Sequence, residues 1–340
     1  IRSSLRGVML APTPRTGVDA RSVPCGRVRR ARLHRGDRVA AREAAVGPRR
    51  HQTSHTHSRA SAPSRAATTR STRDGEGEGD AYHHRRRACV VYDVSDRLTP
   101  YDEAWAWQKA LLARALDAGD DSVDAALIVQ HPPTITLGTG STVDHLKFDA
   151  DAPPDGFAVR RCERGGEATY HGPGQLVVYP ILNLARAPHQ ADLHWYMRSL
   201  EAVALVAMRE LGLNASACGR IEGLTGAWCD GHKLAAVGVR ARRWVSYHGV
   251  ALNVCPNLAH FAHIVPCGID DRPVGSVSQM LRGEAGVVSR SDGASTSAES
   301  VRASRDDDDE LLSRARDALI ASFVETFDLD VEISTSAPEL

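Results

Sequence analysis

The sequence predicts an α+β fold in which mixed β-sheets are packed by helices. Short apolar segments with the length and composition of strands follow one another between residues 125 and 254. Two longer segments, 101–118 and 192–213, repeat apolar residues at helical spacing. The strands are not separated one by one by helices, as they would be in a parallel sheet built of βαβ units. This pattern favours one mixed α+β domain.

The folded domain is expected at residues 88–336. Each strand is predicted from an apolar or β-branched run bounded by turn formers, and each helix from an apolar stripe at the 3.6-residue period. Asp230-Gly231, between two such runs, predicts a hairpin turn. In chain order the expected elements are a strand at 89–94, a helix at 101–118, strands at 125–130, 134–137, 157–162 and 177–184, a helix at 192–213, strands at 226–229, 233–239 and 244–254, a helix at 310–327 and a strand at 330–334.

Two internal segments are expected to lack strands and helices. Residues 240–243 are predicted to form a turn between two strands. Residues 283–309 are rich in Gly, Ser, Ala and Asp, which predicts a solvated low-complexity insertion.

Charge divides the chain into two parts. Residues 1–87 hold 20 of the 42 basic and 7 of the 42 acidic residues, and none of those basic residues is lysine. The remaining residues hold 22 basic and 35 acidic side chains, so the net charge of zero averages a basic leader and an acidic body. An Arg-, Ser- and Ala-rich leader with few acidic residues before Asp74 is typical of an organelle transit peptide. A basic tail that binds nucleic acid or a membrane is the alternative, but no Phe, Trp or Tyr precedes Tyr82 to stack on bases.

The cysteines and the hydropathy exclude several classes of protein. No run of about 18 apolar residues exists, so no transmembrane helix is expected. The seven cysteines include no CxxC pair, which argues for a reducing compartment and against a disulfide framework or a structural zinc site. Cys229 and His232 have CxxH spacing without a second pair of ligands, so no metal is expected.

The strongest functional signal is the glycine-rich run from Arg164 to Leu176. Four glycines and one proline set its backbone path, and the polar side chains placed on that path include Arg164, Tyr170 and His171. Because such a segment packs no core and leads directly into a buried strand, we expect it to present a binding surface. Arg164 either binds an anionic group or pins the loop to a neighbouring carbonyl. His171 is a base, a hydrogen-bond donor to substrate or a structural residue.

Two residues are candidates for catalysis. Cys267 lies between Pro266 and Gly268, in a turn that leaves its sulfur open to a substrate, although most cysteines are simply small buried residues. Lys233 is one of three lysines beside 39 arginines, and unlike arginine it can lose its proton when desolvated. Beside a thiol, Lys233 would favour the attacking thiolate. The alternative is a lysine at the surface end of a strand.

Four separate motifs, in the same order, resemble those of the lipoyl(octanoyl) transferase family. They are Arg-Gly-Gly-x-x-Thr-Tyr-His-Gly-Pro-Gly-Gln-Leu at 164–176, Lys-Leu-Ala-Ala-Val-Gly at 233–238, Tyr-His-Gly-Val-Ala-Leu-Asn at 247–253 and Ile-Val-Pro-Cys-Gly at 264–268. The resemblance covers residues 89 to 281. The insertion at 283–309 and the small residues Ala227 and Cys229 depart from the family pattern.

The resemblance implies a fold like that of the biotin/lipoate protein ligases and a cysteine acyl-enzyme. In this sequence it implies Cys267 as the nucleophile that carries the acyl group and Lys233 as the residue that lowers the pKa of the thiol and transfers protons. It implies no cofactor and no metal. The substrate-binding residues it implies are Arg164, Gly165, Gly166, Glu167, Ala168, Thr169, Tyr170, His171, Ala236, Val237, Gly238, Gly249, Val250 and Ala251.

The partners implied are octanoyl-acyl carrier protein as donor and lipoyl domains as acceptors. These acceptors are the lipoyl domains of 2-oxo acid dehydrogenase complexes or the glycine cleavage H protein. A monomer in the plastid stroma is expected, with the mitochondrion as the alternative compartment. The basic cluster Arg240, Arg242 and Arg243 is either the docking patch for these acidic partners or a solvated turn.

Two other functions remain open at this point. An ATP-dependent lipoate-protein ligase would share the fold and activate a free acid, but it would not need a cysteine at position 267. A non-catalytic module that binds the carrier protein would leave Cys267 unreactive.

Overall fold

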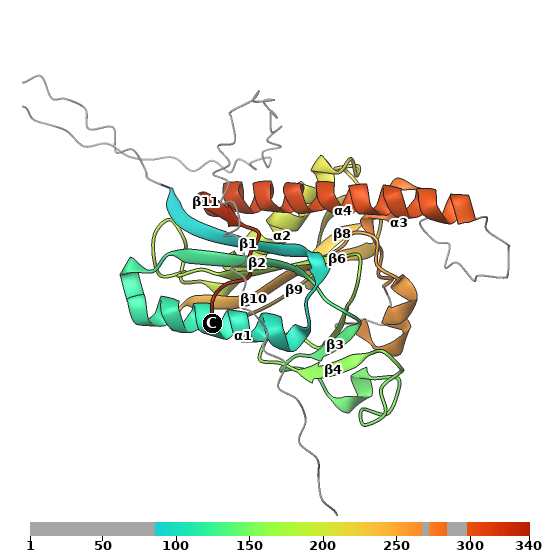
Figure 1. Cartoon of the computed structure of the whole chain (residues 1–340), viewed down its shortest axis with the longest axis horizontal. Coiled ribbons are helices and arrows are strands. Elements are labelled where there is room, and N and C mark those ends of the chain that lie inside the picture. Colours follow the sequence, from blue (N-terminus) through green and yellow to red (C-terminus); the bar gives the residue numbers. More distant parts are fainter. Residues whose placement is uncertain (1–85, 267–271, 284–297) are drawn as a thin grey trace, which may run out of the picture. The chain divides into compact units, whose positions relative to one another are not determined.

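The computed structural model describes residues 86–266, 272–283 and 298–340 (Figure 1). Cys267, residues 284–297 of the expected insertion and all but the last two residues of the expected leader lie outside these ranges. All described residues except Arg86 belong to one compact unit. None of the described helices combines the length and the apolar character needed to cross a membrane.

An eight-stranded mixed sheet forms the centre of this unit. β1 pairs in parallel with β11 and β2, and the other neighbouring strands are antiparallel. The α+β prediction is therefore confirmed. The order across the sheet is β11 (Leu329–Ser334), β1 (Arg87–Leu98), β2 (Asp124–Gln130), β6 (Gln175–Ile181), β10 (Val245–Asn253), β9 (His232–Arg242), β8 (Leu224–Cys229) and β7 (Cys218–Ile221).

A second, three-stranded sheet consists of β4 (Ala158–Arg161), β3 (Thr134–Leu137) and β5 (Ala168–His171), in that order. β3 is parallel to β4 and antiparallel to β5. A small apolar cluster that includes Tyr170 and Phe261 packs on this sheet. Because β5 belongs to the small sheet and β6 to the large one, the glycine-rich run connects the two sheets.

Helices cover both faces of the large sheet (Figure 1). α1 (Tyr101–Ala118) lies on one face and packs Leu112 against Tyr179 and its neighbours. α2 (Leu193–Glu210) and α4 (Ala298–Phe327) lie on the other face, where Phe323 and Met208 belong to the largest core cluster. The short helix α3 (Val277–Leu281) follows the chain that leaves the 267–271 segment. Three short 3₁₀ turns complete the unit: η1 (Gly119–Asp121), η2 (Val143–His145) and η3 (Leu258–His263).

Several predicted elements are confirmed with a local reason. α1 has the predicted bounds. α2 begins directly after Asp192, whose carboxylate accepts hydrogen bonds from the backbone N–H groups of His194 at 2.7 Å and Trp195 at 3.3 Å, as an N-cap does. Asp230 and Gly231, with φ of 46° and 76°, form the predicted hairpin turn between β8 and β9.

Three expectations about irregular segments were wrong. The glycine-rich run contains a strand, β5, because residues 168–171 pair with β3. β9 continues to Arg242, opposite Val245 of β10, and the turn is formed by Arg243 and Trp244. Residues 298–309 are helical and form the start of α4. The C-terminal half of α4 packs in the core, and extending a helix that has already formed costs little free energy.

The expected absence of disulfides was also wrong. Cys218 of β7 and Cys229 of β8 lie directly opposite each other in the antiparallel ladder and form a disulfide, with Cα atoms 4.0 Å apart. The counting argument missed this bond because β7 was not among the predicted strands, and only strand pairing brings these two cysteines together.

Candidate active site

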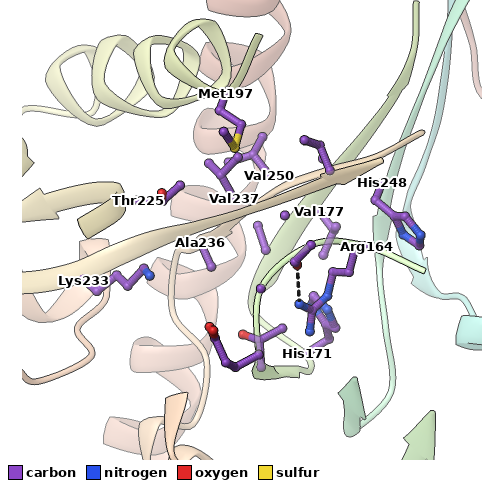
Figure 2. Close-up of a pocket in the computed structure, with 18 of the residues that line it drawn as sticks. Arg164, His171, Val177, Met197, Thr225, Lys233, Ala236, Val237, His248 and Val250 are labelled. Atoms are coloured by element: carbon purple, nitrogen blue, oxygen red, sulfur yellow. Dashed lines mark hydrogen bonds between the residues drawn. The ribbon is translucent and has the colours of Figure 1, made fainter. Parts of the chain in front are cut away.

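A cavity of about 380 Å³ lies between the glycine-rich run and strands β9 and β10 (Figure 2). Most of the predicted site residues line it: Arg164–Glu167, Thr169, His171, Lys233, Ala236–Gly238 and Gly249–Ala251. Ala168 and Tyr170 do not reach it, and Cys267 lies outside the described residues. Other lining residues come from α1, β6, α2 and the β7–β8 turn.

The cavity has two unlike ends (Figure 2). Lys233 stands at one end, close to the exposed Thr225, and we call this the reactive end. His171, His248 and Val177 stand at the other end, which we call the buried end. Tyr179 belongs to it because its ring lies 6.4 Å from that of His248, and Tyr101 because its ring lies 5.6 Å from that of His131, which is itself 5.6 Å from the His171 ring. All five lining residues, His171, His248, Val177, Tyr179 and Tyr101, are less than 9% exposed.

Arg164 pins the glycine-rich run to the small sheet. Its Nη2 donates to the carbonyl oxygen and to the hydroxyl of Thr136, both at 2.8 Å, and its Nη1 donates to the carbonyl of Gly165 at 3.1 Å. The backbone N–H of Gly165 in turn donates to the carbonyl of Val239 in β9 at 3.0 Å. Of the two roles open from the sequence, the structure shows Arg164 in the pinning role.

Two glycines make room for this arrangement. A Cβ atom on Gly238 would lie 3.0 Å from Cδ of Arg164 and 3.1 Å from the carbonyl oxygen of Gly165. A Cβ atom on Gly138 would collide with the carbonyl oxygen of Gly166. The loop therefore fits between β3 and β9 only because both positions lack a side chain.

Strand alternation separates the residues of β5. Thr169 and His171 face the cavity, whereas Ala168 and Tyr170 face the small apolar cluster. The Tyr170 hydroxyl is 2.7 Å from Nδ1 of His260. Within β5 the motif thus contributes only every second residue to the cavity, whereas Arg164–Glu167 before the strand all line it.

His171 belongs to a buried polar network. Its Nδ1 is 2.7 Å from Oε1 of Gln175, and its Nε2 is 3.3 Å from the Thr136 hydroxyl. Gln175 donates through Nε2 to Oδ1 of Asn253 at 2.8 Å, and Asn253 donates to the carbonyl of Gly275 at 3.0 Å. With both ring nitrogens engaged, His171 holds the cavity wall in place.

Burial keeps the imidazoles around the cavity neutral. It lowers the pKa of His171 well below its ordinary value, that of His131 to about 4 and that of His248 to about 3. Burial also raises the pKa of the Tyr179 hydroxyl above its usual range. The imidazoles and the Tyr179 phenol of the buried end are therefore uncharged at neutral pH. The Arg164 guanidinium lies beside His171 and His248 and is a charged group at this end.

His248 adopts an unusual backbone conformation. Its φ is 59°, in the left-handed region that few side chains other than Asn, Asp and His enter. α1 holds it there, because the backbone N–H donates to Oε1 of Gln108 at 2.9 Å and the ring stacks on Trp105 at 5.0 Å. Strained residues of this kind cluster at functional sites.

Lys233 is buried without an acceptor for its charge. It is 8% exposed, its Nζ lies 5.4 Å from the centre of the Trp228 ring, and no hydrogen-bond acceptor for Nζ is found within the described part of the chain. A Cβ atom on Gly226 would lie 2.7 Å from Cε of Lys233, so this glycine opens the space for the side chain. A lysine in this environment is available to act on a bound group.

Glu201 of α2 holds Gly226, the glycine that borders the Lys233 side chain, in place. Its carboxylate is 1% exposed and accepts a hydrogen bond from the backbone N–H of Gly226 at 2.8 Å. The same carboxylate pairs with Arg198 and Arg220, each at 2.8 Å. Arg198 lies on α2 itself, whereas the Arg220 ion pair fixes α2 to β7 and the Gly226 hydrogen bond fixes α2 to β8, including the glycine that borders Lys233.

The backbone of Lys233 is bonded to the chain that follows the 267–271 segment. Its N–H donates to the carbonyl of Pro273 at 2.9 Å, and the N–H of Gly275 donates to the carbonyl of Lys233 at 3.1 Å. On the other side of the segment, the N–H of Val265 donates to the carbonyl of His145 at 2.9 Å. The described chain on both sides of Cys267 is thus anchored, and one side is anchored at Lys233 itself.

The model of the lipoyl protein ligase A/B catalytic domain matches residues 100–289, which is more than half of the chain. The chain belongs to this family. It is 42% identical over 257 residues to octanoyltransferase LIP2p2, chloroplastic, of Arabidopsis thaliana, a match that spans 74% of this chain and 84% of the relative. It is 54% identical over 177 residues to an octanoyltransferase of Synechococcus elongatus, spanning 52% of this chain and 72% of the relative. Within the lipoyl protein ligase A/B family the chain is therefore an acyltransferase of the octanoyltransferase type.

Among solved structures, a putative lipoate protein ligase from T. acidophilum aligns with a TM-score of 0.48 at 16% identity. The alignment covers 74% of this chain and 88% of that one.

Some lining residues of this lipoyl protein ligase A/B family member were not found from the sequence. Val177 and Tyr179 lie in β6, which is buried at every position, so the sequence of that strand indicated only a core strand. Met197 and Tyr101 belong to the helices α2 and α1, whose apolar stripes indicated only core packing. Glu201 could have been noticed as a charge within the apolar stripe of α2. Among the described residues, no group of three His, Cys, Asp or Glu side chains is placed to bind a metal.

Proposed function

We propose that this octanoyltransferase-type chain transfers an octanoyl group from octanoyl-acyl carrier protein to a lysine of a lipoyl domain, through a thioester on Cys267. The observation that carries the proposal is the cavity itself. Its buried end has uncharged imidazole and phenol rings for an acyl chain. At its other end stands Lys233, whose Nζ has no acceptor among the described residues and whose backbone is bonded to the chain that follows Cys267.

The uncharged rings that line the buried end fit a straight acyl chain. Gly238 and Gly249 place no side chains in the middle of the cavity, and burial holds His171 and His248 uncharged. Burying apolar surface is favourable by about 25 cal/mol for each Å² removed from water, so an eight-carbon chain gains binding free energy in this cavity. The Nη atoms of Arg164 are bonded to Gly165 and Thr136, and its Nε is buried without a partner among the described residues.

The reaction takes two steps. In the first, the Cys267 thiolate attacks the thioester carbonyl, the bond from that carbonyl to the carrier's thiol sulfur breaks, and the leaving thiolate takes a proton from the Lys233 ammonium. In the second, the acceptor lysine amine attacks the Cys267 thioester, gives a proton to the Lys233 amine and forms an amide as the Cys267 thiolate leaves. The proton that the leaving carrier thiolate takes and the proton that the acceptor amine gives up both pass through Lys233. This role needs an amine whose Nζ is free.

Energetics indicate that this route needs no ATP. The first step exchanges one thioester for another and is nearly isoenergetic, and the second makes the more stable amide. A free fatty acid would first have to be activated with a nucleotide, which is the chemistry of an ATP-dependent lipoate-protein ligase. We assign the chain to the transferase because position 267 is a cysteine.

The proposal extends to the partners and the compartment. The acceptors are lipoyl domains of 2-oxo acid dehydrogenase complexes or the glycine cleavage H protein, and the enzyme acts as a monomer. The plastid stroma is the proposed compartment, supported by the Arg-rich composition of residues 1–87 and by a chloroplastic relative. A reporter fused to residues 1–87 should enter plastids; entry into mitochondria alone would contradict the assignment.

The decisive experiment is the intact mass of the full chain after incubation with octanoyl-acyl carrier protein. The protein should gain one octanoyl group, lose it to a lipoyl domain, and do both without ATP. Cys267→Ala should show neither event. Cys255→Ala is the matched control, since burial raises the pKa of this thiol to about 12 and leaves it unreactive. Acylation of Cys267→Ala, or lipoyl-domain modification only with octanoate and ATP, would overturn the proposal.

A further inference from the structure

A second hollow of about 380 Å³ lies beside the cavity, and among the residues that the structure describes Tyr101 is the one that lines both. The second hollow is bordered by Cys162, Arg160 and Arg240 and opens towards solvent. Tyr101 therefore forms a wall, one side of which faces the acyl cavity and the other side the second hollow.

Tyr101 is placed at the buried end of the cavity. It is the first residue of α1, directly after Pro100, and it is 6% exposed. Its ring lies 5.6 Å from that of His131, whose Nε2 is 2.9 Å from the Tyr179 hydroxyl. Tyr101 therefore lies near Tyr179 at the buried end of the cavity, away from Lys233.

The Tyr101 hydroxyl is buried and makes no hydrogen bond of normal geometry among the described residues; it lies near the Cys162 thiol, which is a weak partner. Burial raises the pKa of this phenol above its usual range, so it stays neutral. The position therefore depends mainly on the volume of the aromatic ring.

Burial indicates which end of the cavity takes the tail of the acyl chain. At the buried end, Val177 and Tyr179 are 1% and 3% exposed, whereas Thr225 at the reactive end is exposed. An apolar tail gains most where it is removed from water, and the reacting carbonyl must remain near Lys233. The tail therefore points towards Tyr101.

We propose that Tyr101 sets the maximum length of the acyl chain by closing the buried end of the cavity against the second hollow. This inference rests on the proposed acyl transfer and adds its length limit. A small side chain at position 101 joins the two hollows and lets a longer chain continue into the second one. A larger side chain shortens the space.

The test measures kcat/KM for transfer from acyl carrier proteins loaded with chains of six to fourteen carbons. The wild-type enzyme should favour octanoyl. Tyr101→Ala should raise the ratio of twelve-carbon to eight-carbon kcat/KM by about tenfold or more. The reason is that admitting or excluding even one methylene group at an apolar pocket changes kcat/KM by at least about tenfold. Tyr101→Trp should shift the preference to six carbons. Tyr101→Phe should keep the wild-type profile, because the position depends mainly on the volume of the aromatic ring.

Tyr92→Ala is the matched control. It removes the same side chain from β1, where it lines neither hollow, and should leave the length profile unchanged. An unchanged profile in soluble, active Tyr101→Ala overturns the inference, and so does an equal shift in Tyr92→Ala. If Tyr101→Ala is insoluble, an unchanged profile in Tyr101→Trp overturns it. Absence of octanoyl transfer by the wild-type enzyme would instead contradict the proposed function.

Discussion

At the buried end of the cavity, polar side chains are bonded to one another and held neutral: His171 contacts Gln175 and Thr136, and His131 contacts Tyr179. At the reactive end, Lys233 has no acceptor for its Nζ among the described residues and lies over an aromatic ring. Nε2 of His248 and Nε of Arg164 at the buried end also lack a partner among the described residues. The two ends therefore differ in the kind of group they present: neutral rings at the buried end, and an amine that can exchange its proton at the reactive end.

This difference shows how one cavity separates recognition from chemistry. At the buried end, hydrogen-bonded side chains form a wall that changes little when a ligand binds. At the reactive end, the Lys233 amine can exchange its proton. Substitutions at the two ends should therefore have different consequences for kcat and KM.

The largest effect is expected at the reactive end. Lys233→Arg keeps a cation there but cannot release a proton at neutral pH, so the rate of octanoyl transfer should fall by about a hundredfold, mainly in kcat. Lys147→Arg, at an exposed lysine, is the control and should behave as wild type. A near-normal kcat in Lys233→Arg would show that the reactive end needs only a positive charge.

The next effect is expected at the wall of the buried end. In Gly238→Ala the new methyl group meets Arg164 and Gly165 at 3.0 and 3.1 Å, which should push the glycine-rich run out of place. Overpacking strain of about 1–3 kcal/mol corresponds to a rise of about 5- to 150-fold in KM for the acyl donor, with a smaller change in kcat. Gly219→Ala is matched to it, because nothing lies within 4 Å of a Cβ atom there. Equal KM values for the two variants would contradict the packing argument.

The two ends also differ in how far the sequence predicts them. The motifs at 164–176 and 233–238 indicated most of the wall and Lys233, because glycines and rare lysines stand out in a single sequence. The same motif did not reveal that Ala168 and Tyr170 turn away, since that depends on the pairing of β5 with β3. Residues at long separation, such as Tyr101 and Met197, carry no local signal of their place in the cavity.

In the fold, too, local features were predicted from the sequence and contacts between distant residues were not. α1, α2 and most strands were predicted from periodicity and caps, which are local properties. The Cys218–Cys229 disulfide was not predicted, because it depends on which strands become neighbours. The bond between Glu201 and Gly226 also joins different elements, and no spacing rule connects them.

The neutral histidines of the buried end predict acid sensitivity. The unfolded chain binds protons at His131, His171 and His248 below about pH 6.5, whereas the folded chain does not until the pH falls to about 4 or lower. Stability should therefore fall as the pH decreases from about 6.5 to 4, by up to about 1.4 kcal/mol per pH unit for each histidine. Asp124 acts in the opposite sense, because burial raises its pKa to about 6 and the folded chain binds that proton more readily. Urea unfolding between pH 7 and 5 measures the balance; constant stability would show that these rings are not held neutral.

The smallest effect is expected for the basic cluster at the end of β9. Arg242 and Arg243 lie at the turn between β9 and β10, whereas Lys233 lies at the start of β9. At about 3.3 Å per residue, the strand places Arg242 about 30 Å from Lys233. A carrier protein that delivers its thioester to the reactive end would dock away from this turn.

Arg242→Ser combined with Arg243→Ser should therefore change kcat/KM for octanoyl-acyl carrier protein by less than about twofold, with little change in its dependence on salt. Exposed charges that make no close pair contribute little to binding. Arg242→Lys with Arg243→Lys keeps the charge and serves as the control. A loss in the serine variant that grows at low ionic strength, and that the lysine variant restores, would instead identify the turn as the docking patch. Donor docking would then have to extend along β9 from this turn to Lys233, and the separation between the two ends of the cavity would not apply to partner recognition.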